Sequence, residues 1–66
     1  MTQKHSIRKH LLRGDTITPL DALRAYGVFR LAARIKELRD DGLNISTVRI
    51  DDRGKRFARY HLRLSK

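Results

Sequence analysis

The spacing of apolar residues changes once along this chain, near Leu43. Before that point, apolar side chains recur every three or four residues, which is typical of helices that bury one face. After it, they alternate with polar and charged side chains, which is typical of β-strands. The change of period predicts an α+β fold in which three helices are followed by a two-stranded β-hairpin.

The first predicted helix extends from about Gln3 to Arg13. Its inner face contains Ile7 and Leu11, which lie four residues apart. Gly14 follows at once, in the place where a left-handed residue commonly closes a helix. We therefore expect a short amphipathic helix that ends at this glycine.

The segment Thr18-Pro19-Leu20-Asp21 carries the clearest helix start in the chain. It combines an N-cap threonine, a proline at the first helical position and an acidic residue three positions after the cap. A second helix is predicted from here to Gly27. The residues expected on its inner face are Leu20, Ala22, Leu23 and Tyr26.

A third helix is predicted from Val28 to Asp41, closed by Gly42. The second helix, the glycine turn and this longer helix have the pattern of a helix-turn-helix unit, although any corner of two helices looks similar. The residues expected on the inner face of the third helix are Val28, Leu31, Ala32, Ile35 and Leu38.

Two strands are predicted after Leu43, the second reaching Leu64, with a turn at residues 51–55 whose Asp and Gly residues favour turn conformations. Ile45 is out of step with Val48, which indicates a bulge or a later start of the first strand. The hairpin face expected to pack on the helices consists of Val48, Ile50, Tyr60 and Leu62.

Length and charge limit what the chain can be. Sixty-six residues make a single domain, residues 1–66, and the lack of cysteine leaves stability to the apolar core. The net charge of +9 is spread over the predicted elements and favours a polyanionic partner. The apolar runs are far too short to span a membrane, so we expect a soluble, cytoplasmic protein with no membrane partner.

The sequence offers little for catalysis or metal binding. His5, His10 and His61 fall in different predicted elements and are expected to face solvent. Asp40 and Asp41 are interpreted as a solvated pair beside Arg39 and Lys36. We therefore expect no enzymatic activity, no cofactor, no metal site and no small-molecule substrate.

The outward half of the third predicted helix is the first candidate binding surface. Arginine suits bidentate contact with guanine, a small alanine allows close approach, and an aromatic ring suits the thymine methyl group. An alternative for Phe29 is packing against the hairpin or the first helix. The candidate DNA-binding residues here are Phe29, Arg30, Ala33, Arg34 and Lys36.

The basic hairpin is the second candidate surface. Cations at its tip and outward face are expected to contact phosphates or the neighbouring minor groove, which fixes register without reading bases. Arg8, Lys9 and Arg24 either extend these contacts or are ordinary surface charges. The candidate DNA-binding residues of the hairpin are Arg53, Lys55, Arg56 and Arg59, with Arg63 and Lys66 beyond them.

The segment from Ile17 to Ile45, ITPLDALRAYGVFRLAARIKELRDDGLNI, is followed by a basic hairpin that ends in RYHL. This combination resembles the small winged helix-turn-helix proteins of bacteriophages and prophages. The resemblance implies that residues 29–41 form a recognition helix and that the hairpin is a wing. Leu23 departs from the family pattern, which has a small residue four positions before the turn glycine.

The leading hypothesis is a protein of the bacterial host cytoplasm that binds double-stranded DNA sequence-specifically. It would act as a phage-type transcriptional regulator or as an excisionase-like recombination directionality factor, and copies would associate on the DNA. One rival is a protein-interaction module that docks an acidic host or phage protein, with the Phe29 surface in contact. Binding of structured RNA is the third hypothesis.

Overall fold

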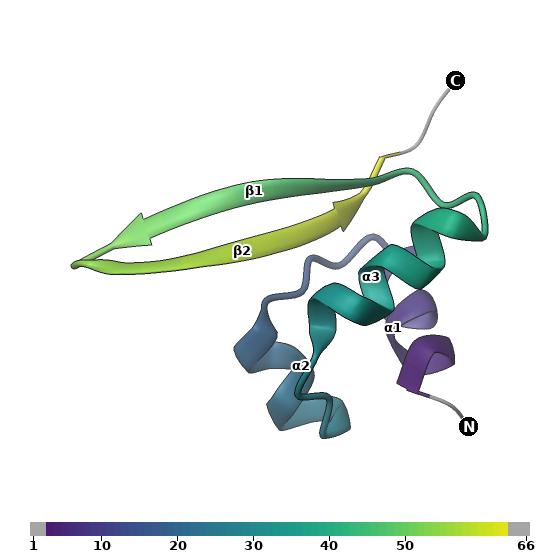
Figure 1. The fold of residues 1–66 in the computed structure, drawn as a ribbon, viewed down its shortest axis with the longest axis horizontal. Helices are drawn as coiled ribbons and strands as arrows, with labels where there is room; N and C mark the ends of the chain where they lie inside the picture. Colours follow the sequence, from purple (N-terminus) through teal and green to yellow (C-terminus); the bar gives the residue numbers. More distant parts are fainter. Residues whose placement is uncertain (1–2, 64–66) are drawn as a thin grey trace.

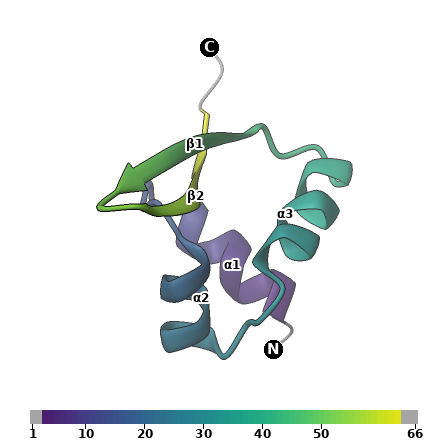
Figure 2. The same cartoon turned by 60° about the vertical axis from the view of Figure 1, so that its left-hand side comes forward.

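The computed structural model describes residues 3–63 and contains three helices and one antiparallel hairpin (Figure 1). The elements are α1 (Gln3–Leu12), α2 (Pro19–Tyr26), α3 (Leu31–Asp40), β1 (Ile45–Asp52) and β2 (Lys55–Leu62). The helices pack together beneath the base of the hairpin, and the hairpin tip projects beyond them (Figures 1 and 2). The predicted α+β architecture, three helices followed by a two-stranded hairpin, is confirmed. Leu64 and Lys66 lie outside the described residues.

The core collects side chains from all three helices and from the base of the hairpin. Ile7 and Leu11 of α1 are fully buried, as their spacing predicted. An exposed ion pair between Lys4 Nζ and Asp41 Oδ2, 2.6 Å apart, joins α1 to the end of α3, so Asp41 is not simply solvated. The hydrogen bond to Asp41 raises the pKa of Lys4. The other buried residues are Ile17, Ala22, Val28, Leu31, Ile35, Leu38, Ile45 and Tyr60.

Helix α2 begins where the sequence predicts. The Thr18 side chain accepts from the Asp21 amide and the Asp21 carboxylate accepts from the Thr18 amide, both at 3.1 Å, so the capping box is complete. The expected inner face is wrong in part, because Leu20 and Leu23 are 53% and 40% exposed while Ala22 is buried. Residues two apart on a helix point to nearly opposite sides, so Leu20 and Ala22 could not both face inward.

Helix α3 is shorter than predicted and begins at Leu31 rather than Val28. Gly27 closes α2 in the left-handed conformation, with φ 67°, and the Val28 amide still donates to the Ala22 carbonyl at 3.1 Å. Val28, Phe29 and Arg30 therefore belong to the turn. Val28 is buried three residues before Leu31, and this spacing imitates the helical pattern.

The hairpin register runs one-to-one from Ile45↔Leu62 to Asp52↔Lys55, without a bulge. Because side chains alternate along a strand, Ile45 and Tyr60 face the core and Val48 lies on the opposite face. The expected bulge or late start, and the placing of Val48 and Ile50 on the packing face, were wrong. Beyond Ile45 the strand leaves the body, so the inner positions of β1 need not be apolar.

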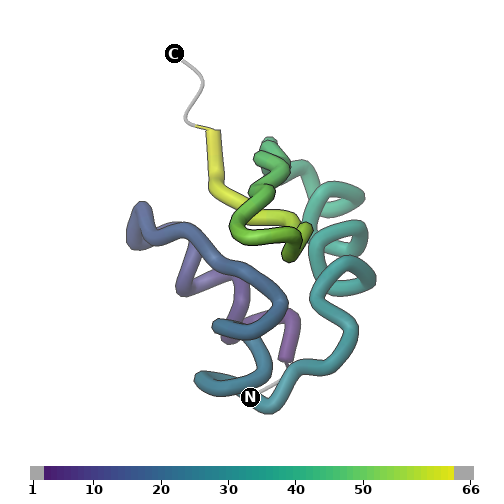
Figure 3. The backbone as a smooth tube through the Cα atoms, turned by 90° about the vertical axis from the view of Figure 1, so that its left-hand side faces the viewer, coloured from purple at the N-terminus to yellow at the C-terminus, as the bar shows by residue number. Residues whose placement is uncertain are grey.

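An isolated β-bridge lies beside the two-stranded sheet. Ile17 pairs with Tyr60 on the edge of β2 away from β1, through hydrogen bonds of 3.0 and 2.8 Å between their backbones. Viewed from the left-hand side of Figure 1, the hairpin projects with α2 and α3 on either side below it (Figure 3). The segment between α1 and α2 is thereby hydrogen-bonded to β2. This contact fixes the position of the hairpin base relative to the helices.

Candidate nucleic-acid interface

The turn before α3 carries the most exposed large apolar side chain of the described chain. Phe29 is 83% exposed, so the alternative in which it packs on the hairpin or on α1 is wrong. Arg30 is the N-cap of α3, makes no side-chain capping bond and is exposed. Both residues thus lie at the amino-terminal end of α3 with side chains that a ligand can reach. The prediction that they lie within the helix was wrong, because α3 begins at Leu31.

The surface of α3 differs on its two flanks. The flank toward α1 holds Arg34, whose Nε lies 3.0 Å from Glu37 Oε1, so this arginine is already in an ion pair. Ala33 is half-buried and Ala32 is exposed, which reverses the expectation for these two alanines. The reason is that α1 packs along the Arg34 and Glu37 side, so the covered sector of α3 extends toward Ala33.

The other flank of α3, toward the hairpin, is open. It presents Ala32 and Lys36, both exposed. Lys36 has no hydrogen bond or ion pair within residues 3–63. This flank and the turn residues Phe29 and Arg30 form one continuous candidate surface.

The hairpin cations are divided between two faces, whereas the sequence predicted a single basic surface at the tip and outward face. Arg56 shares the inner face with Ala58, and its Nε lies 3.8 Å from Asp51 Oδ2 in an exposed ion pair. Lys55 and Arg59 lie on the outer face. Arg53 occupies the tip with a left-handed φ of 53°.

Apolar side chains accompany the outer cations. Phe57 and Val48 are 37% and 41% exposed on that face. A groove of about 650 Å³ lies between this face and the start of α2, and Leu20, Phe57, Lys55 and Arg59 are among the residues that line it. The outer face is therefore a mixed apolar and basic surface, whereas the distal part of the inner face, with Arg49, Asp51 and Arg56, is polar.

Arg39 is a residue that the sequence did not single out. Its Nε and Nη2 donate to the Ile45 carbonyl at 3.1 and 2.8 Å, and Nη2 also lies 2.9 Å from Thr47 Oγ1. The side chain thus bridges the last turn of α3 and the first residues of β1. An arginine in the last turn of a helix that is followed by a glycine and a strand is the only local signal for such a bridge.

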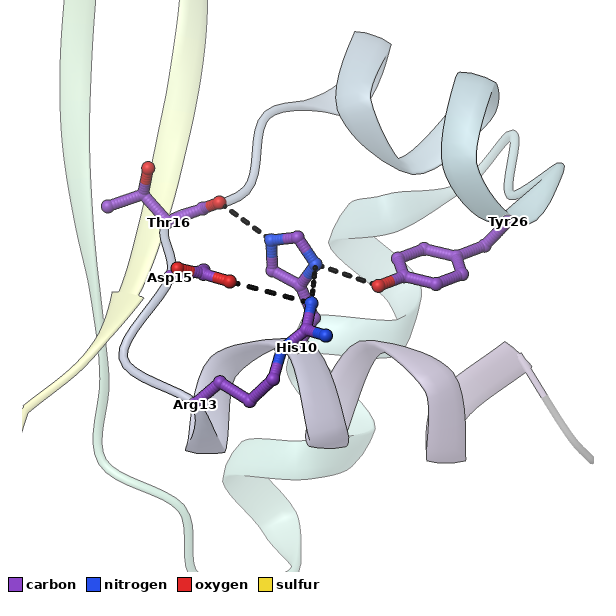
Figure 4. A network of polar contacts seen from close by, with 5 residues as sticks. All are labelled: His10, Arg13, Asp15, Thr16 and Tyr26. Atoms are coloured by element: carbon purple, nitrogen blue, oxygen red, sulfur yellow. Dashed lines mark hydrogen bonds and ion pairs between the residues drawn. The ribbon is translucent and has the colours of Figure 1, made fainter.

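His10 is held by hydrogen bonds, contrary to the expectation that it faces solvent (Figure 4). Its Nε2 donates to the Thr16 carbonyl at 2.9 Å, and its Nδ1 then accepts from the Tyr26 hydroxyl at 2.7 Å. The two rings meet edge to face, and Arg13 reaches both Nδ1 and Asp15. The network fastens α1 to α2. Within residues 3–63 no cluster of side chains could hold a metal ion.

A comparison with known families fits this geometry. Residues 2–64 match the model of the winged helix-turn-helix domain, and the chain belongs to this family. No curated protein and no solved structure matches the chain. Membership indicates DNA binding, and α3 and the hairpin take the places of recognition helix and wing. None of the described helices is long and apolar enough to cross a membrane.

Proposed function

We propose that the protein binds double-stranded DNA sequence-specifically, as a phage-type transcriptional regulator or an excisionase-like recombination directionality factor. The observation that carries the proposal is the pair of uncommitted side chains, Phe29 and Arg30, at the amino-terminal end of α3. They adjoin the open flank of α3 in a chain with a net charge of +9.

In this proposal α3 enters the major groove and its open end reads bases. Arg30 donates two hydrogen bonds to a guanine, and Phe29 contacts a thymine methyl group. Lys36 continues the contact almost two turns later, and the small, exposed Ala32 on the same flank allows the backbone to approach. Ala33, predicted from the sequence for this role, is half-buried on the α1 side. Arg34 stands apart, since it must leave Glu37 before it can reach a base.

The wing contributes affinity rather than sequence preference. Its cations, Arg53, Lys55, Arg56 and Arg59, neutralise phosphates on both sides of the hairpin tip. A wing with cations on both faces suits insertion into a minor groove, where the two walls are different strands. The excess positive charge also opposes self-association in solution, so copies are expected to assemble only on DNA.

The test begins with selection of the preferred duplex from random sequences by the purified protein. Arg30→Ala should then weaken binding to that duplex by about 1 to 3 kcal/mol and leave most binding to random duplex intact. Arg13→Ala, which removes a charge already paired with Asp15 at the far end of α1, is the matched control. Equal losses on both duplexes would make Arg30 a phosphate contact.

The exposure of Phe29 also keeps a second candidate, a protein-interaction module with an acidic partner. Phe29→Ala separates DNA binding from binding of an acidic protein, because the loss of the ring should weaken DNA binding only if the ring contacts a base. Weaker binding to thymine-containing sites, but not to the same sites with uracil, supports DNA. Unchanged DNA binding would remove Phe29 from the base-reading surface and leave it available for a protein partner.

The assembly state is checked by sedimentation and footprinting. A monomer is expected without DNA, and adjacent copies on the selected site are expected at spacings near whole helical turns. A tight dimer in free solution would contradict this part of the proposal. A promoter reporter and a recombination assay on the selected site distinguish the two regulatory roles.

A further inference from the structure

The connection from recognition helix to wing is short, and a side chain spans it. Gly42 and Leu43 turn the chain from α3 toward β1, with the Leu43 amide donating to the Leu38 carbonyl at 3.1 Å. Arg39 crosses this turn and binds the Ile45 carbonyl twice and Thr47 Oγ1 once. These acceptors lie at the point where β1 leaves the body, because Ile45 is buried and Thr47 is exposed.

The geometry of this bridge is that of a brace. A guanidinium group is planar, and two of its N–H groups bound to one carbonyl define a direction as well as a distance. Both acceptors are neutral, and within residues 3–63 Arg39 forms no ion pair. The arrangement therefore orients the strand relative to α3 and does not serve to neutralise a charge.

We propose that Arg39 is a positioning residue that fixes the angle between α3 and the wing, and with it the spacing between the DNA contacts of helix and wing. The inference rests on the proposed DNA binding and adds to it the residue that aligns the two contacts. Arg39 acts through Ile45 and Thr47 and does not itself touch DNA.

Loss of the brace should loosen the wing without unfolding the body. Ile45 remains in the core, and the hydrogen bonds between Ile17 and Tyr60 hold the other edge of the sheet. The wing would then sample more orientations, and binding would have to restrict them, which lowers affinity. The expected loss of affinity therefore comes from the DNA contacts of the wing and not from those of α3.

Three substitutions separate positioning from direct contact. Arg39→Met keeps the aliphatic stem and removes every donor, Arg39→Lys keeps the charge and removes the planar fork, and Thr47→Val removes one acceptor at nearly constant shape. Arg39→Met and Arg39→Lys should both weaken binding to the selected duplex, on the order of tenfold, as for residues coupled in one network. Thr47→Val should have a smaller effect of the same kind.

A double-mutant cycle supplies the decisive comparison. In a protein whose wing cations Arg53, Lys55, Arg56 and Arg59 are all neutralised, Arg39→Met should cause little further loss, because the contacts that it aligns are already gone. If Arg39 instead contacts a phosphate, Arg39→Lys would retain near-normal affinity and the effects of Arg39→Met and of the wing substitutions would add. Either result would overturn the proposal.

A measurement on the free protein keeps this inference separate from the proposed function. Residual dipolar couplings and ¹⁵N relaxation of the β1 and β2 amides report the orientation and order of the wing relative to α3. Arg39→Met should reduce wing order while the amides of α1, α2 and α3 keep their wild-type values. Unchanged wing order would overturn the inference even if DNA binding is confirmed, whereas wild-type protein that binds no duplex would overturn the proposed function alone.

Discussion

The helical body and the distal half of the hairpin are stabilised in different ways. In the body, each helix contributes fully buried apolar side chains, and the base of the hairpin adds Ile45 and Tyr60. From residue 46 to residue 59 no side chain is buried, and the strands are joined by their backbone ladder and a tip turn with Gly54 at φ 79°. The body is therefore constrained by packing, while the wing surface can be given over to contacts with a ligand.

The largest expected effect is on the body. Ile35 is 1% exposed at the centre of α3, so Ile35→Ala should lower the free energy of unfolding by about 2 to 5 kcal/mol through lost burial and a cavity. That is a large part of the total stability of so small a domain. Urea unfolding measures it. Lys36→Ala, one residue away and exposed, is the control and should stay within about 0.5 kcal/mol of wild type; equal effects would mean that α3 is not packed as described.

A smaller effect is expected at the start of α2. Thr18→Ala removes the acceptor for the Asp21 amide and should lower the free energy of unfolding by about 0.5 to 2 kcal/mol. Thermal melts with Thr16→Ala as the matched control measure it, since no hydrogen bond of the Thr16 hydroxyl occurs within residues 3–63. A loss of equal size in the control would attribute the effect to the loop and not to the cap.

The contact between α1 and α2 comes next. Tyr26→Phe deletes the hydroxyl that donates to His10 Nδ1 and should cost about 0.5 to 1.5 kcal/mol of unfolding free energy. Tyr60→Phe is the matched control, because no hydrogen bond of its hydroxyl occurs in the described part of the chain. If the two tyrosines respond alike, the hydrogen bond to His10 is not what fastens α2.

The smallest effect on stability is expected in the wing. Neutralising Arg53, Lys55 and Arg56 together should change the free energy of unfolding by no more than about 0.5 kcal/mol. DNA binding should nevertheless weaken on every duplex, and the salt slope should fall by roughly 0.9 for each lost phosphate contact. Titrations at several salt concentrations measure this. A changed sequence preference or an unchanged slope would show that the wing does not bind phosphates.

The difference between the two regions also explains what the sequence could predict. The start of α2 followed from Thr18, Pro19 and Asp21 because a cap is made by neighbours in the chain. The start of α3 did not, because tertiary packing buries Val28 at a spacing that also suits a helix. Prediction succeeded at this cap because the contacts that form it are between neighbours in the chain.

The sheet and the site depended on contacts between distant residues. The core face of β1 could not be inferred, since Ile45 is its one buried residue and the apolar Val48 and Ile50 face the other way. The exposure of Phe29 and the reach of Arg39 across the turn likewise depend on what surrounds them. The predicted wing residues Arg53, Lys55, Arg56 and Arg59 lie on the hairpin, but their division between two faces required the register.

The pairing of Ile17 with Tyr60 has a consequence for the order of folding. These two residues are brought together only when the intervening chain, with α2, α3 and β1, has closed into a loop, and loop closure is entropically costly. Their amide protons should therefore exchange with solvent only through global unfolding, whereas amides near Gly54 exchange through local opening. The amides of Ile17 and Tyr60 would report completion of the whole fold, and the amides near Gly54 would report local opening of the hairpin tip.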